Sequence, residues 1–252
     1  MIVHSIDPIL LTLGPLQIRW YGLLYATGWL IAYFLVGAEV KKRKLASEEM
    51  FHKIFLYALI GGVVGARLGS VISEWPYYAQ NPAEIFAIWH GGVAFHGGLA
   101  GLLIVGWWQL KKHKISFLKA ADVVSGPVAL SLGIGRIGNF INSEFYGTVT
   151  SLPWGVVFPG VAGPRHPVQL YETILMIGIF LALLYMKNKK IPDGMLFATF
   201  LISYGVGRFL LEYLKDPAQV THILGLTWGQ FWNIPMVIAG AYIIYKSRPK
   251  AK

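Results

Sequence analysis

Residues Val168–Met186 read VQLYETILMIGIFLALLYM, an almost unbroken apolar run long enough to cross a bilayer as one helix. Similar runs recur, so that 55% of the 252 residues are hydrophobic and 13% are charged, with a mean hydropathy of +0.55. A water-soluble globule cannot bury that much apolar surface. The sequence therefore predicts an all-α polytopic membrane protein with seven transmembrane helices. The predicted spans are Trp20–Ala38, Ile54–Ile72, Val93–Leu110, Leu118–Ile134, Val168–Met186, Met195–Leu214 and Trp228–Tyr245.

The fourth predicted span differs from the others because polar residues and a proline interrupt it. Asp122, Ser125 and Pro127 all fall within it. Polar groups in a membrane helix need protein partners. We therefore expect this helix to face the interior of the bundle.

The net charge of +10 is distributed in a way that indicates membrane topology rather than nucleic-acid binding. Sixteen of the 22 Lys and Arg lie on alternate connections and in the C-terminal tail. This is the positive-inside pattern, and it predicts an outside N-terminus and a cytoplasmic C-terminus. The sixteen are Lys41, Lys42, Arg43, Lys44, Lys53, Lys111, Lys112, Lys114, Lys119, Lys187, Lys189, Lys190, Lys246, Arg248, Lys250 and Lys252.

The remaining six basic residues lie within the spans or in the outer connections, and five of them are arginines. The guanidinium group is a planar fork that grips a phosphate or carboxylate at two points. These arginines therefore suggest a phosphate-bearing ligand, although Arg19, Arg67 and Arg165 could equally be snorkelling or ion-paired structural residues. The six are Arg19, Arg67, Arg136, Arg165, Arg208 and Lys215.

The strongest functional candidate is the run GRIGNFINSEFYG at Gly135–Gly147, which follows the fourth span. It places Arg136, two asparagines (Asn139 and Asn142) and Glu144 beside an apolar helix. An arginine in that position is costly to bury and is usually functional.

A second polar group lies on the sixth predicted helix. Tyr204, Arg208 and Glu212 are spaced four apart and form one stripe. The stripe must face protein or a wet cavity. Glu212 offsets the burial cost of Arg208, so the stripe is either a ligand site or a structural ion pair.

His96 lies in the glycine-rich run GGVAFHGGLAG at the outer end of the third span. It is the best-placed group for general-base chemistry near neutral pH. The alternative is a hydrogen-bonded residue that orients the helix end.

Two connections on the outer side are too elaborate to be simple loops. Residues 75–90 are rich in aromatic and apolar residues and hold no Lys or Arg, which predicts a segment lying in the outer membrane interface. Residues 145–167 contain four prolines and predict a small extracytoplasmic head. We see no further domain, so we treat residues 1–252 as a single integral-membrane domain.

The chain contains no cysteine, which excludes disulfides, thiolate metal sites and a cysteine nucleophile of its own. No cluster of metal-ligand residues is visible, so we expect no metal and no cofactor. Any thiol that reacts here must belong to a substrate.

Five motifs in order resemble those of the bacterial prolipoprotein diacylglyceryl transferase family. They are RWYGLLY at Arg19–Tyr25, FHGGL at Phe95–Leu99, GRIGNFINSEFYG, RHPVQLYE at Arg165–Glu172 and YGVGRFLLE at Tyr204–Glu212. The resemblance implies an enzyme of the bacterial inner membrane with its active site on the outer side. It would transfer the diacylglyceryl group of phosphatidylglycerol to the lipobox cysteine of prolipoprotein signal peptides, with release of glycerol phosphate.

Carried over position by position, the resemblance places the family's essential histidine on His96 and its two essential arginines on Arg136 and Arg208. It implies that a further group of residues surrounds the lipid headgroup. That group is Tyr21, Asn139, Glu144, Gly147, Tyr204 and Glu212, and we add Asn142 from the same motif.

The residues alone leave three other classes of membrane protein open. A membrane acyltransferase would also use histidine and lipid, but it would move an acyl group. An anion transporter would usually show paired broken helices in related halves, which we do not find. A structural scaffold would leave Arg136 and Arg208 tolerant of substitution.

Overall fold

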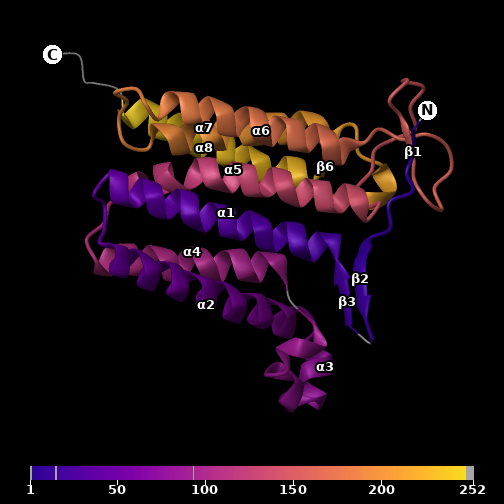
Figure 1. Cartoon of the computed structure of the whole chain (residues 1–252), viewed down its shortest axis with the longest axis horizontal. Coiled ribbons are helices and arrows are strands. Elements are labelled where there is room, and N and C mark those ends of the chain that lie inside the picture. The colour runs from indigo at the N-terminus through magenta and orange to yellow at the C-terminus, as the bar shows by residue number, and fades with distance from the viewer. Residues whose placement is uncertain (1, 15, 93, 248–252) are drawn as a thin grey trace. The chain divides into compact units, whose positions relative to one another are not determined.

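The computed structural model of the protein describes residues 2–14, 16–92 and 94–247. Each predicted span coincides largely with one long helix (Figure 1). Val93, the first residue of the third predicted span, lies outside the described residues, as do residues 248–252 of the basic tail. The long helices are α1 (Trp20–Lys42), α2 (Glu48–Ser73), α4 (Phe95–Lys112), α5 (Phe117–Ile141), α6 (Val168–Met186), α7 (Met195–Glu212) and α8 (Trp228–Ser247).

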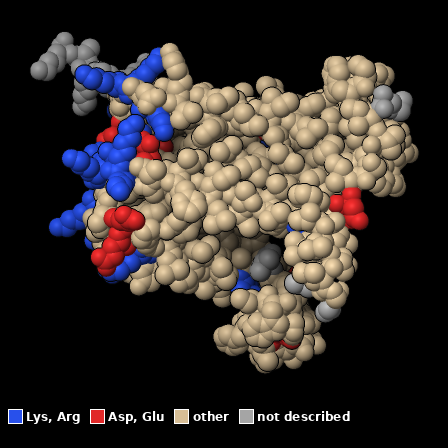
Figure 2. Space-filling view, in the orientation of Figure 1, with Lys and Arg blue, Asp and Glu red and all other residues tan. Residues whose placement is uncertain are grey.

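The helices identify a multi-pass membrane protein. Within the described residues, α1, α2, α5, α6 and α7 are each long and apolar enough to cross a membrane. Their flanks expose large apolar side chains such as Phe34, Ile72 and Ile174. In Figure 2 the visible sides of the long helices are almost entirely tan, so they carry few charged side chains. Helices α4 and α8 fill the two other predicted windows but are less apolar.

The chain divides into two compact units. One comprises Met1–Val36 and Ala121–Lys252, and we call it the α5–α8 unit. The other comprises Gly37–Ala120, and we call it the α2–α4 unit. The two units are described separately below.

The core of the α5–α8 unit is an apolar cluster formed by three helices. Ala129 of α5 packs with Met176 and Ile179 of α6 and with Phe200 and Leu201 of α7. Helix α8 packs against α7 at small residues. A Cβ added to Gly205 or Gly240 would meet a branched side chain of the facing helix at 2.7 Å. Close helix approach at small residues is a common way to pack membrane helices.

Helix α5 is polar on its buried side, as the sequence predicts. The Asp122 carboxylate accepts hydrogen bonds from the backbone N–H of Gly194 (2.7 Å) and of Phe197 (2.8 Å), which caps the first turn of α7. The Ser131 hydroxyl donates to the Gly28 carbonyl of α1 at 2.7 Å. Because these polar groups have protein partners, this side of the helix can be buried.

Short strands lie outside the long helices, and the sequence analysis did not predict them. β2 (Ile9–Leu13) and β3 (Leu16–Arg19) form an antiparallel hairpin before α1. β1 (Ile2–Val3) pairs in parallel with β4 (Val156–Val157), so the N-terminal segment is joined to the segment 145–167. The last pair is β5 (His222–Ile223) with β6 (Leu226–Thr227). The strands β1, β4, β5 and β6 have only two residues each, too few to show a periodicity in the sequence.

The α2–α4 unit is built on a glycine-lined contact between its two long helices. A Cβ on Gly65 would collide with the carbonyl oxygen of Gly97, and a Cβ on Gly61 would lie 2.9 Å from the carbonyl oxygen of Gly101. The backbones therefore touch directly. The segment 75–90, which connects α2 to α4 in the chain, forms α3 (Trp75–Gln80) and the two 3-10 turns η1 (Pro82–Ile85) and η2 (Ile88–His90).

Candidate functional site

The GRIGNFINSEFYG motif occupies the last turns of α5 and the turn after it. The helix continues to Ile141, seven residues beyond the predicted end of the span, so Arg136 and Asn139 lie one turn apart on the same face. Arg136 Nη1 donates to Asn139 Oδ1 at 3.1 Å, and Asn139 Nδ2 donates to Glu144 Oε2 at 3.2 Å. Asn142 Nδ2 donates to the other Glu144 oxygen at 3.3 Å. Four motif side chains are thus joined in one hydrogen-bonded chain.

The turn after α5 is held in an uncommon backbone conformation. Ser143 and Phe145 both adopt φ of +58°, which non-glycine residues seldom do. Between them, the Glu144 N–H donates to the Asn139 carbonyl at 3.0 Å, and Gln169 Nε2 donates to the Glu144 carbonyl at 2.5 Å. The first bond ties Glu144 back to α5, and the second ties it to α6. Backbone strain of this kind is often found at functional sites.

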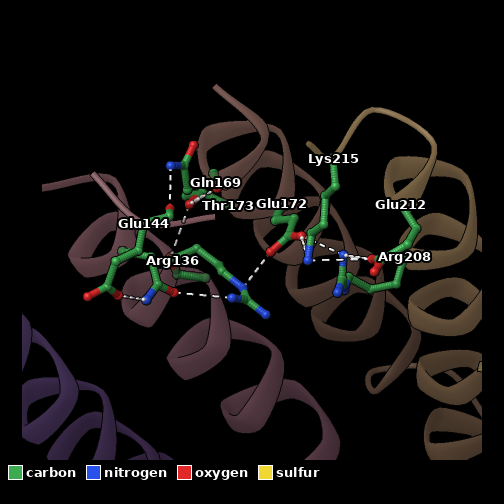
Figure 3. Close-up of polar contacts among 10 residues, drawn as sticks. Arg136, Glu144, Gln169, Glu172, Thr173, Arg208, Glu212 and Lys215 are labelled. Carbon is green, nitrogen blue, oxygen red and sulfur yellow. Dashed lines mark hydrogen bonds and ion pairs between the residues drawn. The ribbon is translucent and has the colours of Figure 1, made fainter. Parts of the chain in front are cut away.

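A buried carboxylate connects the motif arginine to the α7 arginine. Glu172 of α6 is 2% exposed, and its Oε2 lies 2.5 Å from Arg136 Nε. Its other oxygen, Oε1, accepts from Arg208 Nη1 at 2.5 Å. Figure 3 shows Glu172 between the two guanidinium groups, with one oxygen directed to each. One side chain therefore holds both candidate arginines in place.

Lys215 and Glu212 complete this ion cluster. Arg208 Nη1 lies 3.0 Å from Glu212 Oε2, so the expected pair on α7 is present. Lys215 Nζ lies 3.6 Å from Glu172 Oε1 and 3.4 Å from Glu212 Oε2. Burial, together with the nearby Arg208, lowers the pKa of the Lys215 ammonium below its usual range, and the two carboxylates oppose that shift.

Exposure within the cluster follows a gradient. The side chains of Glu172, Glu212 and Lys215 are almost fully buried, and that of Arg208 is 10% exposed. The side chain of Arg136 is 25% exposed, so it forms the accessible end. Among the residues that the structure describes, no partner is present for Arg136 Nη2. A ligand anion would therefore meet Arg136 first.

Tyr21, Gly147 and Tyr204 surround this cluster within the same unit. The Tyr21 ring packs on α5, where a Cβ on Gly138 would lie 2.9 Å from it. Gly147 is bridged to Lys215, and any side chain there would collide with the Leu214 carbonyl. Tyr204 lies one turn before Arg208. Gly147 therefore serves close packing, which joins the motif to the Lys215 turn.

His96 belongs to the α2–α4 unit. It is the second residue of α4, its side chain is exposed, and its ring lies 5.6 Å from that of Phe95. Within residues 2–14, 16–92 and 94–247, no hydrogen bond to the His96 ring is present. The ring is therefore not held in a helix-end hydrogen bond in this structure.

The arginine with the most extensive structural role is Arg67 of α2. It is buried, and its guanidinium donates to the carbonyls of Ile85 (3.0 Å), Gly91 (2.5 Å), Gly92 (2.9 Å), Ala87 (3.0 Å) and, more closely, Glu84. The Tyr78 ring lies 5.1 Å from its guanidinium carbon. All these partners belong to residues 75–92, so Arg67 fastens that segment onto α2.

Two other arginines that the sequence left undecided lie outside the ion cluster. Arg165 Nη1 pairs with Asp216 Oδ2 at 2.6 Å and its guanidinium lies over the Tyr146 ring. Arg19 lies in β3, opposite Ile9, and is exposed. Neither is positioned by Glu172.

Comparison with known proteins decides the family. A sequence profile of the prolipoprotein diacylglyceryl transferase family matches residues 8–246. The chain belongs to this family. Three similar proteins bear the name phosphatidylglycerol–prolipoprotein diacylglyceryl transferase. The one from Geobacter sulfurreducens is 42% identical over 242 residues, which cover 93% of each chain. The one from Bordetella parapertussis is 40% identical over 257 residues and 98% of each chain. The one from Pseudoalteromonas atlantica is 39% identical over 247 residues, 94% of this chain and 87% of its own.

In this prolipoprotein diacylglyceryl transferase family member, the α5–α8 unit gathers every sequence-predicted site residue except His96. The sequence analysis gave no role to Glu172, Gln169 or Lys215, which the structure connects directly to that group. A signal for two of them was present, since Gln169 and Glu172 lie three residues apart and form a polar stripe on an otherwise apolar helix.

Proposed function

We propose that this protein transfers the diacylglyceryl group of phosphatidylglycerol to the thiol of the lipobox cysteine in prolipoprotein signal peptides, with release of glycerol phosphate. Family membership supports the reaction class. The observation that carries the proposal at the level of residues is the pair Arg136 and Arg208, both held by Glu172. Two fixed guanidinium groups at one place are what a phosphate leaving group requires.

The reaction is a displacement at carbon. The substrate thiol loses its proton to a base, and the thiolate attacks the glycerol carbon that is bonded to the phosphate oxygen. A carbon–sulfur bond forms, the carbon–oxygen bond breaks, and its electron pair remains on the departing phosphate. Arg136 and Arg208 would stabilise the negative charge that grows on that oxygen.

The residues around the arginines would bind the lipid headgroup. Asn142 Oδ1 is buried and accepts no hydrogen bond within the described residues, so it is available to a headgroup hydroxyl. Asn139 and Glu144 would orient Arg136 through the bonds described above. The binding site for the headgroup would also include Tyr21, Gly147, Tyr204 and Glu212.

His96 is our proposed base for the substrate thiol. A cysteine with an ordinary pKa of about 8.5 is mostly protonated at neutral pH. An exposed imidazole could accept its proton, whereas a positive field from the arginines could raise the thiolate fraction without a base. The pH dependence of a His96 variant distinguishes these two routes.

We further propose that all seven long helices cross the bacterial inner membrane, with the N-terminus outside, the C-terminus cytoplasmic and the site on the outer side. The basic connections after α1, α4 and α6 support this orientation. The segment 75–90 would lie in the outer interface, since Phe86 and Trp89 are highly exposed. Residues 145–167 would form a small extracytoplasmic head within one membrane domain.

The decisive test is reconstitution. Purified protein is incubated with phosphatidylglycerol and a synthetic lipobox peptide, and the peptide is analysed by mass spectrometry. A diacylglyceryl increment on cysteine supports the proposal, and an acyl increment would indicate an acyltransferase instead. A peptide with serine in place of the cysteine is the control and should remain unmodified.

A further inference from the structure

The ion cluster carries one unit of excess positive charge. Within the described residues, three cations (Arg136, Arg208 and Lys215) face two carboxylates (Glu172 and Glu212) at 2.5–3.6 Å. The group is mostly buried, so water screens its charges little.

Glu144 does not cancel this excess charge. Its side chain is exposed and reaches Arg136 only through Asn139. Surface charges are strongly screened, and they contribute little to the potential at a buried site. Lys215 is counted as an ammonium ion, and its Nζ lies 3.6 Å from Glu172 Oε1 and 3.4 Å from Glu212 Oε2.

A buried site discriminates between anions by their charge. Attraction to the site grows in proportion to the charge of the ligand, whereas the cost of removing the ligand from water grows with the square of that charge. A site with one excess charge therefore compensates a monoanion better than a dianion. Removal of one carboxylate would shift that preference toward the dianion.

We propose that Glu172 is a positioning and specificity residue that limits the excess charge of the phosphate site to one. The site would thereby favour a phosphodiester monoanion over a phosphate monoester dianion. This inference rests on the proposed function, in which the substrate lipid is a phosphodiester and the released glycerol phosphate is a monoester. A monoester carries close to two charges at neutral pH, because its second pKa is about 6. Glu172 would then favour entry of the substrate and departure of the product.

The test measures binding of two water-soluble probes to the purified full-length protein in detergent, with no turnover required. The probes are glycerophosphoglycerol, a monoanionic phosphodiester, and glycerol 1-phosphate, each used to displace a fluorescent short-chain phosphatidylglycerol. For the wild type at pH 7.5, the diester should bind more tightly than the monoester. In Glu172→Gln, this ratio should shift toward the monoester by about tenfold or more, since a full unit charge close to the ligand is removed.

Two further variants separate charge from structure. Glu172→Asp keeps the charge and should keep the wild-type preference. The double variant Glu172→Gln with Lys215→Gln again has one excess positive charge, so it should recover the wild-type preference for the diester. Glu39→Gln, which removes a carboxylate paired with Arg43 elsewhere, is the matched control and should leave the ratio unchanged.

The wild type alone supplies an independent test if a variant does not fold. Glycerol phosphate loses its second charge below about pH 6, so its affinity should rise at pH 5 while that of the diester, which does not titrate there, serves as the reference. The inference would be overturned if glycerol phosphate bound with the same affinity at pH 5 and pH 7.5. It would also be overturned if folded Glu172→Gln kept the wild-type ratio of diester to monoester affinity. Absence of the mass increment in the reconstitution, with the anion preference intact, would instead refute only the proposed transferase reaction.

Discussion

Replacement of either site arginine by lysine should abolish most of the activity although the charge is retained. Arg208 Nη1 contacts both Glu172 at 2.5 Å and Glu212 at 3.0 Å, so this one nitrogen is committed to carboxylates. A further hydrogen bond joins the guanidinium to Tyr204, and the N–H donors that are left would face the phosphate. A lysine ammonium placed between the same two carboxylates has no second nitrogen with which to reach a ligand.

The size of the loss follows from the bonds that disappear. One charge-assisted hydrogen bond contributes about 1.5–3 kcal/mol, which corresponds to a fall of roughly ten- to a hundredfold in rate. In Arg136→Lys, the bond to Asn139 that steadies Glu144 would also be lost. We therefore expect a loss at least as large in Arg136→Lys as in Arg208→Lys.

The assay is the initial rate of diacylglyceryl peptide formation at saturating phosphatidylglycerol, normalised to monomeric folded protein. Arg43→Lys is the matched control, because Arg43 forms a partly exposed i,i+4 pair with Glu39 that lysine can replace. It should retain the wild-type rate. A wild-type rate in Arg136→Lys or Arg208→Lys would show that the position supplies only charge and would refute the forked-contact argument.

Other changes test separate parts of the structure. His96→Gln should lower turnover by about a hundredfold if the imidazole is the base, with partial recovery at higher pH as the thiol ionises unaided; loss of lipid binding would show instead that His96 builds the pocket. Arg67→Lys should reduce the yield of folded protein more than turnover per folded molecule, because the carbonyls of residues 84–92 lose their donors; an unchanged yield measured by size-exclusion chromatography would contradict that role. In intact cells, cysteine at Ser151 should react with an impermeant thiol reagent and cysteine at Asn188 should not, since the chain has no other cysteine; the reverse pattern would overturn the proposed orientation.

The sequence predicted best those features that lie within a single helix. Apolar length predicted the long helices, and the four-residue spacing predicted that Arg208 and Glu212 pair. Polar residues such as Asp122 predicted a helix with one side turned to protein, and in the structure that polar side is buried. These features depend on local periodicity, which the chain displays directly.

Contacts between segments distant in the chain could not be predicted in the same way. The role of Glu172 depends on three elements that bring Arg136, Arg208 and Lys215 to one carboxylate. The sequence analysis ended the fourth span at Ile134, because the residues that follow are polar, whereas α5 continues to Ile141. Arg136 and Asn139 instead continue it, since their side chains bond to each other and to the following turn.

The hydrogen bonds from Asp122 fix the start of α7 at the level of Asp122 in α5. Arg136 follows Asp122 by 14 residues, and Arg208 follows Gly194 by the same number. At 1.5 Å per residue, 14 residues of helix span about 21 Å, so each arginine lies roughly that far along its helix from the Asp122 cap. The equal spacing brings Arg136 and Arg208 to the same level. Insertion of one residue between the cap and the arginine in either helix would move that arginine by about 1.5 Å along the helix axis and rotate it away from the other.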